Sequence, residues 1–416
     1  SRGVVVTGAS NDFDSSDHQN GMFWPRVWPG NGLEPNDLSA PSTDLSRAVT
    51  TYRLRSNATS FGPHALFSVS HGGSTSEATP TLAGVAALVV AEGRQAADQH
   101  LVTGQLTAGE VKQVVRETAS NIDDPNLGWP GLPGATFNIQ YGYGRPNVLN
   151  ADQAVASGRI PPVPDILAPN WYALYDPERT SQVPISADIQ VPRASSFDYV
   201  VQYGLGDQPL ESGFHTIASG HVVGHGKRGV VATLGLSSIP RSFWTAPFRF
   251  TADLSSTEQY DVTIRIQATD NHGLMGEDRR VIAVFHDPTI RPGFPKLLGQ
   301  GQDSQPVLAD LQGSGKLDIV FGDSDGYVHA LNPDTGRELP GWPAHTNALS
   351  TGLRGTSAWR AGAVPKTAYE PIEASPAVGD LFGNGALEVV VASMTGREYV
   401  FDRHARELRG FPRTTG

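Results

Sequence analysis

The chain has 416 residues, of which 46 are Gly and 31 are Pro, and this abundance of turn-forming residues excludes a helical bundle or a coiled coil. Lys and Arg total 31 against 42 Asp and Glu, and the net charge of −11 argues against a nucleic-acid partner. There is no Cys, which excludes disulfides, thiolate catalysis and Cys-ligated metal centres. The longest apolar run, Leu82–Val90, is too short to span a membrane, so we expect no transmembrane segment.

Residues 1–158 mix strand and helix patterns, which is typical of an α/β domain. Val4–Ala9 predicts a buried strand, and residues 11–43, rich in Asp, Asn, Pro and Gly, predict a long irregular segment. A strand so close to the first residue usually pairs with something upstream, so we expect the N-terminus to be a truncation or a processing site. Apolar periodicity and capping signals predict helices at Thr75–Gln95, from Thr107 onward (a Thr-Ala-Gly-Glu capping box) and at Asn150–Ala156.

The middle of the chain changes character at the Pro-rich stretch Ile160–Pro164. Each Pro fixes φ and disfavours helix in the residue before it, so we predict a stiff linker at 159–167. From 168 to 290 the patterns indicate strands separated by turn residues, which favours an immunoglobulin-like β-sandwich. The predicted strands are Val183–Val191, Tyr199–Tyr203, Val230–Leu234 and Tyr260–Ala268.

Residues 291–416 contain an internal repeat. Asp310–Val320 recurs as Asp380–Val390 at an offset of 70 residues. Each copy continues into a second strand, Tyr327–Leu331 or Tyr399–Phe401, and closes with a Gly-aromatic-Pro turn. Such units cannot bury their faces alone, so they stack as propeller blades or solenoid coils. Two blades do not close a ring, and we expect further repeats beyond the C-terminus.

Ser74, Thr75 and Ser76 place hydroxyl groups at the start of the first predicted helix. A helix N-terminus offers free backbone N–H groups and a positive dipole end. A serine there could attack a carbonyl while the N–H groups stabilise the resulting oxyanion. The alternative, which is the simpler one on these residues alone, is that one of the hydroxyl groups merely caps the helix.

The stretch Gly73–Leu88 resembles the nucleophile segment of the subtilisin-like serine proteases, Gly-Thr-Ser-x-Ala-x-Pro followed by a helix of small residues. Three further segments, Val4–Ser10, Thr59–Pro63 and Tyr141–Val155, resemble the same family in the same order. The resemblance implies that residues 1–158 form the C-terminal half of a subtilisin-like catalytic domain. It also implies that Ser76 is the nucleophile, that a polypeptide is the substrate and that no organic cofactor is needed. The positions that match the nucleophile motif and its helix are Thr75, Ser76, Ala78, Pro80, Ala83 and Gly84.

The sequence departs from the family pattern near the nucleophile. Ser74 stands where the family has Gly, and Glu77 stands where it has Met, but neither change removes a reacting group. The resemblance places the catalytic Asp, the catalytic His and the oxyanion-hole Asn upstream of Val4. None of the 12 His lies in the family's His-Gly-Thr context, and His71 is better explained as a loop residue than as the base. We therefore expect this chain alone to be inactive.

The C-terminal repeat resembles the FG-GAP or integrin-type propeller blade, whose loop of the Asp-x-Asp-x-Asp-Gly-x-x-Asp kind binds calcium. Calcium prefers several oxygen ligands from alternate loop positions. The second copy has Phe382 at a ligand position, which cannot coordinate a metal. The alternative is a metal-free β-turn closed by side-chain hydrogen bonds. The candidate calcium ligands are Asp310, Gln312, Ser314 and Asp318 in the first copy and Asp380, Asn384 and Glu388 in the second.

These patterns together predict an extracellular or cell-surface multidomain serine endopeptidase: a partial α/β subtilisin-like domain, an all-β sandwich and partial β-propeller blades at 291–416. One alternative is a catalytically inactive adhesion protein whose sandwich and propeller bind a cell-surface or extracellular partner. A carbohydrate-binding protein is a third alternative, and it would need exposed coplanar aromatic rings. Trp171, Tyr172 and Trp244 are better explained as core or strand-edge residues.

Overall fold

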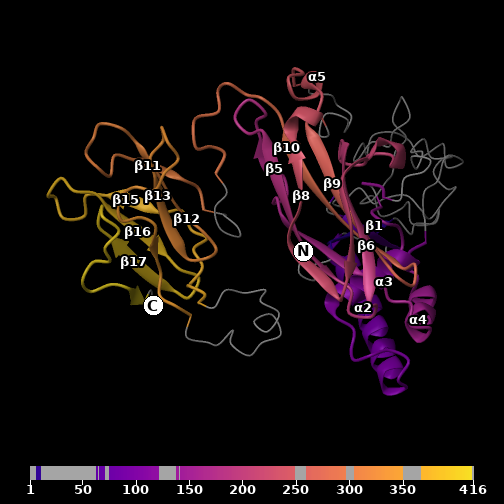
Figure 1. The fold of residues 1–416 in the computed structure, drawn as a ribbon. Helices are drawn as coiled ribbons and strands as arrows, with labels where there is room; N and C mark the ends of the chain where they lie inside the picture. Colours follow the sequence, from indigo (N-terminus) through magenta and orange to yellow (C-terminus); the bar gives the residue numbers. More distant parts are fainter. Residues whose placement is uncertain are drawn as a thin grey trace, which may run out of the picture. The chain divides into compact units, whose positions relative to one another are not determined.

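The computed structural model describes residues 6–10, 62–63, 65–70, 75–120, 137–139, 141–248, 259–296, 304–349 and 367–414. These residues form mainly β-sheets and four α-helices, and none of the sheets that they build closes on itself (Figure 1). The chain divides into two compact units, 1–286 and 287–416. The predicted irregular segment at 11–43 lies outside the described residues.

The first part of the first unit is helical. Strands β1 (Val6–Ser10) and β2 (Ala65–Ser70) pair in parallel, and α2 (Thr75–Asp98) packs against both. Helices α3 (Ala108–Thr118) and α4 (Val148–Ala156) follow, so all three predicted helices are confirmed. Their shared apolar face builds a core that includes Phe67, Leu82, Val89, Val114 and Val155.

The cap of α3 is the predicted capping box. The backbone N–H of Glu110 donates to the Thr107 hydroxyl (3.2 Å), and the N–H of Thr107 donates to the Glu110 carboxylate (2.8 Å). A second partner holds the same carboxylate, because Arg193 donates to it from the β-sandwich at 2.6 Å. One carboxylate therefore starts the helix and fastens it to the next part of the fold.

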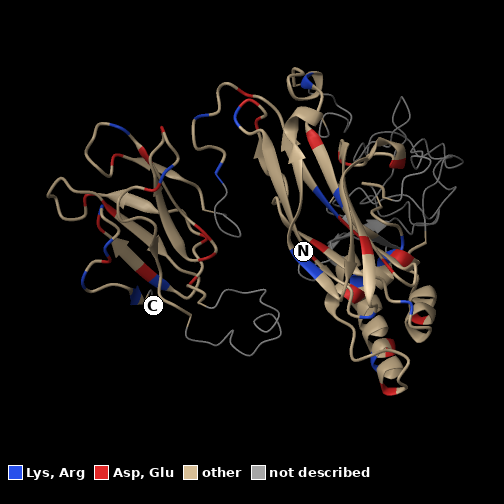
Figure 2. Ribbon diagram, in the orientation of Figure 1, with Lys and Arg blue, Asp and Glu red and all other residues tan. Residues whose placement is uncertain are grey.

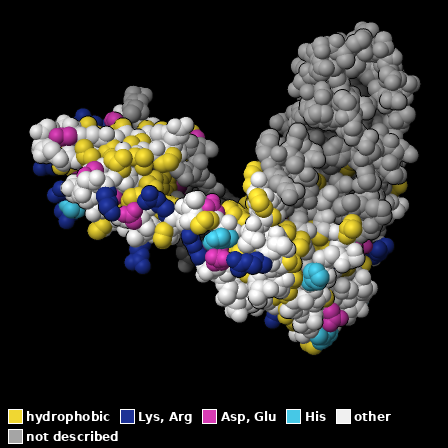
Figure 3. Space-filling model, turned by 90° about the horizontal axis from the view of Figure 1, so that it is seen from above, with side chains coloured by type: hydrophobic (Ala, Val, Ile, Leu, Met, Phe, Trp, Pro, Cys, Tyr) yellow, Lys and Arg dark blue, Asp and Glu magenta, His cyan; other side chains and the backbone are white. Residues whose placement is uncertain are grey.

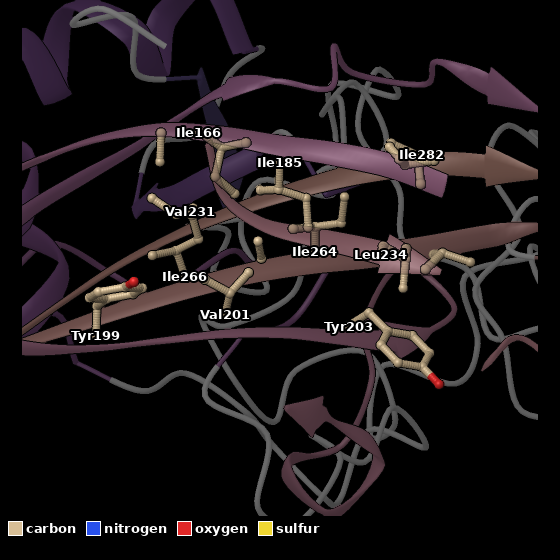
Figure 4. Packing of buried hydrophobic residues seen from close by; sticks show 14 of the residues in the cluster. Ile166, Ile185, Tyr199, Val201, Tyr203, Val231, Leu234, Ile264, Ile266 and Ile282 are labelled. Atoms are coloured by element: carbon tan, nitrogen blue, oxygen red, sulfur yellow. The ribbon is translucent and has the colours of Figure 1, made fainter. Parts of the chain in front are cut away.

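Two sheets pack face to face over residues 163–284. The five-stranded sheet has the order β4-β10-β9-β6-β7 and the three-stranded sheet the order β3-β5-β8. Apolar side chains alternate along β5 and β6, and those that point inward fill the space between the sheets (Figure 4). The strands are β3 (Val163–Ala168), β4 (Leu174–Tyr175), β5 (Gln182–Gln190), β6 (Ser196–Leu205), β7 (His215–Val223), β8 (Gly226–Gly235), β9 (Asp261–Asp270) and β10 (Met275–Val284). The short helix α5 (Arg241–Trp244) lies between β8 and β9.

All four strands predicted in this region are confirmed, as β5, β6, β8 and β9. The stretch that we predicted to be a linker, 159–167, contains most of β3, which pairs with β5. The backbone there lies close to β10: a Cβ built on Gly276 would lie 1.9 Å from the carbonyl oxygen of Pro162. Only Gly allows this approach, so the Pro-rich stretch is part of the packed sandwich.

The second unit consists of two four-stranded antiparallel sheets with one repeat each. The order is β11-β12-β13-β14 in the first and β15-β16-β17-β18 in the second. Val320 pairs with Ala330 and Val390 with Val400, so the offset of 70 residues holds through the first three strands of each sheet and makes His329 equivalent to Tyr399. The strands are β11 (Val307–Ala309), β12 (Asp318–Gly322), β13 (Tyr327–Leu331), β14 (Ala344–His345), β15 (Ala377–Gly379), β16 (Glu388–Ala392), β17 (Arg397–Phe401) and β18 (Arg413–Thr414).

Candidate functional site

Ser76 is the second residue of α2, in the first turn of a helix of 24 residues. The helix begins five residues after β2 ends, so Ser76 sits where the chain turns from a parallel strand into a helix. Pro80 lies inside this helix, beyond its first turn, so its missing N–H removes one hydrogen bond of the helix ladder. The side chains of Thr75, Ser76 and Glu77, and the whole of Ser74 and His71, lie outside the described residues.

Segments that match the protease family lie next to one another around α2. Strand β1, from the Val4–Ser10 match, contacts α2 and pairs with β2. The N–H of Tyr143, from the Tyr141–Val155 match, donates to the carbonyl of Leu66 in β2 at 2.8 Å. The N–H of Gly62, from the Thr59–Pro63 match, donates to the carbonyl of Ile139, two residues before the Tyr141–Val155 match, at 2.8 Å. The structure thus brings together segments that are up to about 140 residues apart in sequence.

The predicted calcium loop of the first repeat is a tight turn around Asp310. The Asp310 carboxylate accepts the N–H groups of Ser314 (2.8 Å) and Gly315 (2.7 Å), and these bonds hold its pKa below the usual range. Gly315 has φ +81, a left-handed conformation that favours Gly. These are the hydrogen bonds expected of a metal-free turn, and a calcium-binding loop uses the same backbone path.

Asp318 is the one candidate ligand whose carboxylate is buried in this loop. It is 2% exposed, and its Oδ2 atom has no hydrogen-bond partner in the described part of the chain. Burial raises its pKa, as does the neighbouring charge of Asp310, while N–H groups of the loop oppose the shift. A buried carboxylate oxygen without a partner is costly. A bound cation would relieve this cost, so the first loop fits calcium.

The second loop has the same backbone shape but a different donor set. Asp380 accepts the N–H groups of Asn384 (3.0 Å) and Gly385 (2.7 Å). Glu388, equivalent to Asp318, accepts the N–H of Leu381 at 3.0 Å. Phe382 is 63% exposed at the position where Gln312 stands in the first loop. The second loop therefore satisfies its carboxylates without a metal and offers fewer oxygens. In the described residues, no three His, Cys, Asp or Glu side chains gather into a metal cluster.

A buried charged cluster that the sequence did not reveal lies between α3 and the outer face of the five-stranded sheet. Its centre is Glu277, whose carboxylate accepts hydrogen bonds from Arg279 (2.7 Å), Gln267 (2.8 Å) and the Tyr143 hydroxyl (2.9 Å). The side-chain amide of Gln113 forms two hydrogen bonds with the backbone of Glu277. Figure 2 shows acidic and basic residues along these strands.

The charges around Glu277 compensate for its burial. Burial alone would raise the pKa of Glu277, but the guanidinium groups of Arg279, Arg116 and Arg265 lower it to about 2. Burial, with the charge of Glu277, raises the pKa of Tyr143 well above its usual value. Glu277 therefore stays ionised and joins the helical part to the sandwich by charge-assisted hydrogen bonds.

The next residues of β10 secure β3 in a similar way. Asp278 accepts a hydrogen bond from the Lys112 ammonium group of α3 at 3.0 Å and another from the N–H of Ile166 at 2.9 Å. Arg280 donates to the carbonyl groups of Ile166 and, at 3.4 Å, Pro169. Polar side chains thus occupy both backbone groups of Ile166, at the irregular step of the β3–β5 pairing.

The second unit has a buried acid–His–acid cluster. His329 lies between Asp323 (3.1 Å) and Glu338 (2.7 Å) and stacks on Phe321. Burial lowers the pKa of His329, but the hydrogen bonds and charges of the two carboxylates outweigh this and raise it to about 9. His329 is therefore a cation at neutral pH. In the second repeat the equivalent residue is Tyr399, whose hydroxyl donates to the Glu370 carboxylate at 2.7 Å. Both repeats therefore have a carboxylate at this position, bound by His329 in the first and by Tyr399 in the second.

Comparisons with known proteins give no assignment. No family model matches the chain, and no curated protein matches it. A solved structure of the periplasmic chaperone SfaE covers 42% of this chain and 95% of its own, with 11% identity and a TM-score of 0.21. The sporulation control protein Spo0M from Bacillus subtilis covers 57% of this chain and 91% of its own, with 10% identity and a TM-score of 0.18. At such TM-scores neither likeness carries an argument. In the described residues no helix is long and apolar enough to cross a membrane.

We expect Glu277→Gln to destabilise the first unit by about 3 to 5 kcal/mol, because it leaves buried guanidinium groups without their counter-charge. The contribution of the ionised carboxylate should be complete above about pH 4.5 and be lost as the pH falls toward about 2, since folding lowers the pKa of Glu277. Urea unfolding at several pH values measures both effects. Glu178→Gln, which breaks an exposed ion pair with Arg241, should cost below about 1 kcal/mol; equal losses for the two variants would contradict this role.

We expect the second unit to lose stability as the pH rises from about 6.5 through about 9. Folding raises the pKa of His329 to about 9, so its contribution is complete below the unfolded pKa of about 6.5 and is lost above the folded one. His329→Gln should flatten this dependence in calorimetric melting curves. His221→Gln, at an exposed His–Asp pair on β7, should leave it unchanged. A wild-type transition that does not change between pH 6.5 and 9 would refute the cluster's role.

Proposed function

We propose that the protein is a serine endopeptidase of the subtilisin-like kind and that Ser76 is its nucleophile. The observation that carries the proposal is the position of Ser76 in the first turn of α2. Strand β1 pairs with β2, which precedes α2 in the chain, and the segment around Tyr143 is hydrogen-bonded to β2. These are the segments whose sequences resemble the family. Their proximity supports reading the separate matches as one site.

In the proposed reaction the Ser76 hydroxyl attacks a peptide carbonyl while a His base takes its proton. The tetrahedral intermediate collapses with loss of the amine, which receives that proton, and water then hydrolyses the acyl-enzyme. The first N–H groups of a helix have no intrahelical partner, so those of α2 would be placed to stabilise negative charge near the serine. No His in this sequence lies in the family's context for the base, so the proposal needs a base from outside the printed sequence.

The remaining parts fit a protein that acts outside the cell. We propose that the two packed sheets of 163–284 are an immunoglobulin-like module and that the two repeats of the second unit are propeller blades of the FG-GAP type. The two packed sheets support the first assignment, and the common register and equivalent Asp turns of the repeats support the second. Such modules would bind an extracellular or cell-surface partner.

We further propose that the first loop of the repeats binds calcium and that the second does not. Asp310 and Asp318 would supply the charge, and the side-chain oxygens of Gln312 and Ser314 would complete the protein ligands. The buried Oδ2 atom of Asp318 is the observation in favour. Calcium there would stabilise the turn that precedes β12.

Fluorophosphonate labelling tests the nucleophile. We expect the protein expressed with whatever coding sequence precedes Ser1 in its gene to be labelled, and Ser76→Ala to abolish the label, because an activated serine reacts and a capping serine does not. The 416-residue chain by itself should stay unlabelled. Ser219→Ala, at an exposed serine on β7, is a control that should keep the label.

Two outcomes of that experiment would change the proposal: the first would overturn it, and the second would correct the source of its base. Absence of label from the longer, folded protein would favour the inactive adhesion protein. Ser74 and Glu77, which stand at the family's Gly and Met positions, are the residues that favour this alternative. Label on Ser76 of the 416-residue chain by itself would show that a base within this chain suffices, so the requirement for a base from outside it would be wrong.

Isothermal titration with calcium tests the loop. We expect one calcium ion per chain with a dissociation constant of about 10⁻⁴ to 10⁻³ M, the range of extracellular modules. Asp318→Asn should weaken binding at least about tenfold, since one of two charged ligands is lost. Asp380→Asn, the matched change in the second loop, should leave binding unchanged. Equal effects of the two variants, or no binding by the wild type, would disprove the assignment.

A further inference from the structure

The second unit begins with a segment that is docked on its first repeat. This entry segment, as we call residues 291–296, lies against the turn 332–336 that follows β13. A Cβ built on Gly293 would overlap the carbonyl oxygen of Thr335, and Gly293 has φ +80, so only Gly allows this approach. The two backbones are therefore in direct contact.

Two cations of the entry segment add polar contacts with the same turn. The Lys296 ammonium group donates to the carbonyl of Gly336 at 2.6 Å, and the Arg291 guanidinium pairs with the Asp334 carboxylate at 2.9 Å. Asp334 also pairs, at 2.7 Å, with Lys316 of the candidate calcium loop. Figure 3 shows basic and acidic side chains side by side on the surface of this unit. One carboxylate therefore connects the calcium loop with the entry segment.

The first loop holds Lys316 by long hydrogen bonds. The backbone N–H of Lys316 donates to the Ser314 hydroxyl at 3.3 Å, and this hydroxyl donates to Asp310 at 3.4 Å. Both bonds are longer than is usual. Calcium would bind the side-chain oxygens of Asp310, Ser314 and Asp318 together. A loop closed on an ion has fewer conformations, so less entropy is lost when Lys316 is fixed against Asp334.

The second repeat has the same docking without the link to a loop. A Cβ built on Gly341 would overlap the carbonyl oxygen of His404, in the turn that follows β17. The Trp342 indole N–H donates to the same turn at 3.2 Å. Ala386 stands where the first repeat has Lys316, and its side chain cannot form an ion pair. The second repeat is therefore an internal control for the first.

We propose that calcium in the first loop strengthens the docking of the entry segment through Lys316 and Asp334. This inference rests on the proposed calcium site. Calcium orders the loop, the ordered loop fixes Lys316 on Asp334, and the carboxylate so fixed keeps Arg291 in place. The three side chains are exposed, and exposed ion pairs contribute little, so calcium strengthens the docking only about two- to fivefold.

Amide hydrogen exchange of the 416-residue chain, with and without about 10 mM calcium, tests the link. The N–H of Phe294 donates to the Arg291 carbonyl at 3.1 Å within the entry segment, so its exchange follows the docking. The equivalent N–H of Trp342 donates to Leu339 at 3.0 Å and is the reference for any stabilisation of the whole unit. We expect calcium to slow exchange at Phe294 about two- to fivefold more than at Trp342.

The variant Lys316→Gln removes the link without removing a proposed ligand. It should bind calcium in isothermal titration, because its side chain is not among the candidate ligands. The additional slowing at Phe294 should disappear, because Gln cannot form the ion pair with Asp334. Arg337→Gln, which removes an exposed cation beside the same turn, is the matched control and should keep the additional slowing.

The outcomes separate this inference from the calcium site on which it rests. A wild type that binds no calcium would overturn both. Calcium binding with equal slowing at Phe294 and Trp342 would keep the site and refute the link. Additional slowing that persists in Lys316→Gln would show that Lys316 does not carry the effect. Faster exchange at Phe294 with calcium would show that the ion draws Lys316 away from Asp334.

Discussion

The first unit depends on one buried carboxylate, that of Glu277. An ionised group at 1% exposure is tolerated only if surrounding charges and hydrogen bonds replace water. Arg279, Gln267 and Tyr143 provide them, and each comes from a different stretch of the chain. Directional polar contacts join the helical part to the β-sandwich. Such an interface fixes orientation, because misplacing either side leaves charges uncompensated.

The hydrogen bonds around Glu277 continue toward the proposed site. Tyr143, which donates to Glu277, is in the segment whose backbone N–H also bonds to Leu66 of β2. Strand β2 in turn leads into α2, on which Ser76 lies. The sandwich is thus connected to the strand–helix turn through a short series of hydrogen bonds. We infer that the sandwich supports the geometry of the serine's segment.

Patterns among neighbouring residues predicted the elements that contacts between neighbouring residues stabilise. Helices α2, α3 and α4 were predictable because their apolar periodicity and caps are written in consecutive residues, as Thr107 and Glu110 illustrate. Strand β10 was not, since Glu277–Arg280 is a run of four charged residues that is typical of an exposed turn, and its burial depends on partners more than 100 residues away as well as on neighbours such as Gln267. The repeat predicted equivalent turns, but the buried Oδ2 atom of Asp318, which has no hydrogen-bond partner in the described residues, depends on packing. The identity of Ser76 as a candidate came from resemblance, because a capping serine and a nucleophile look alike in isolation.

The Pro-rich stretch between the helices and the sandwich has a consequence for how the chain is degraded. Ile160, Pro161 and Pro162 are buried, and the carbonyl of Pro162 lies against Gly276. A peptidase binds its target as an extended strand with both flanks free, which a buried, hydrogen-bonded segment cannot supply. This stretch has the composition of a linker and yet should survive limited digestion. The helices and the sandwich would then persist together as a single protected fragment.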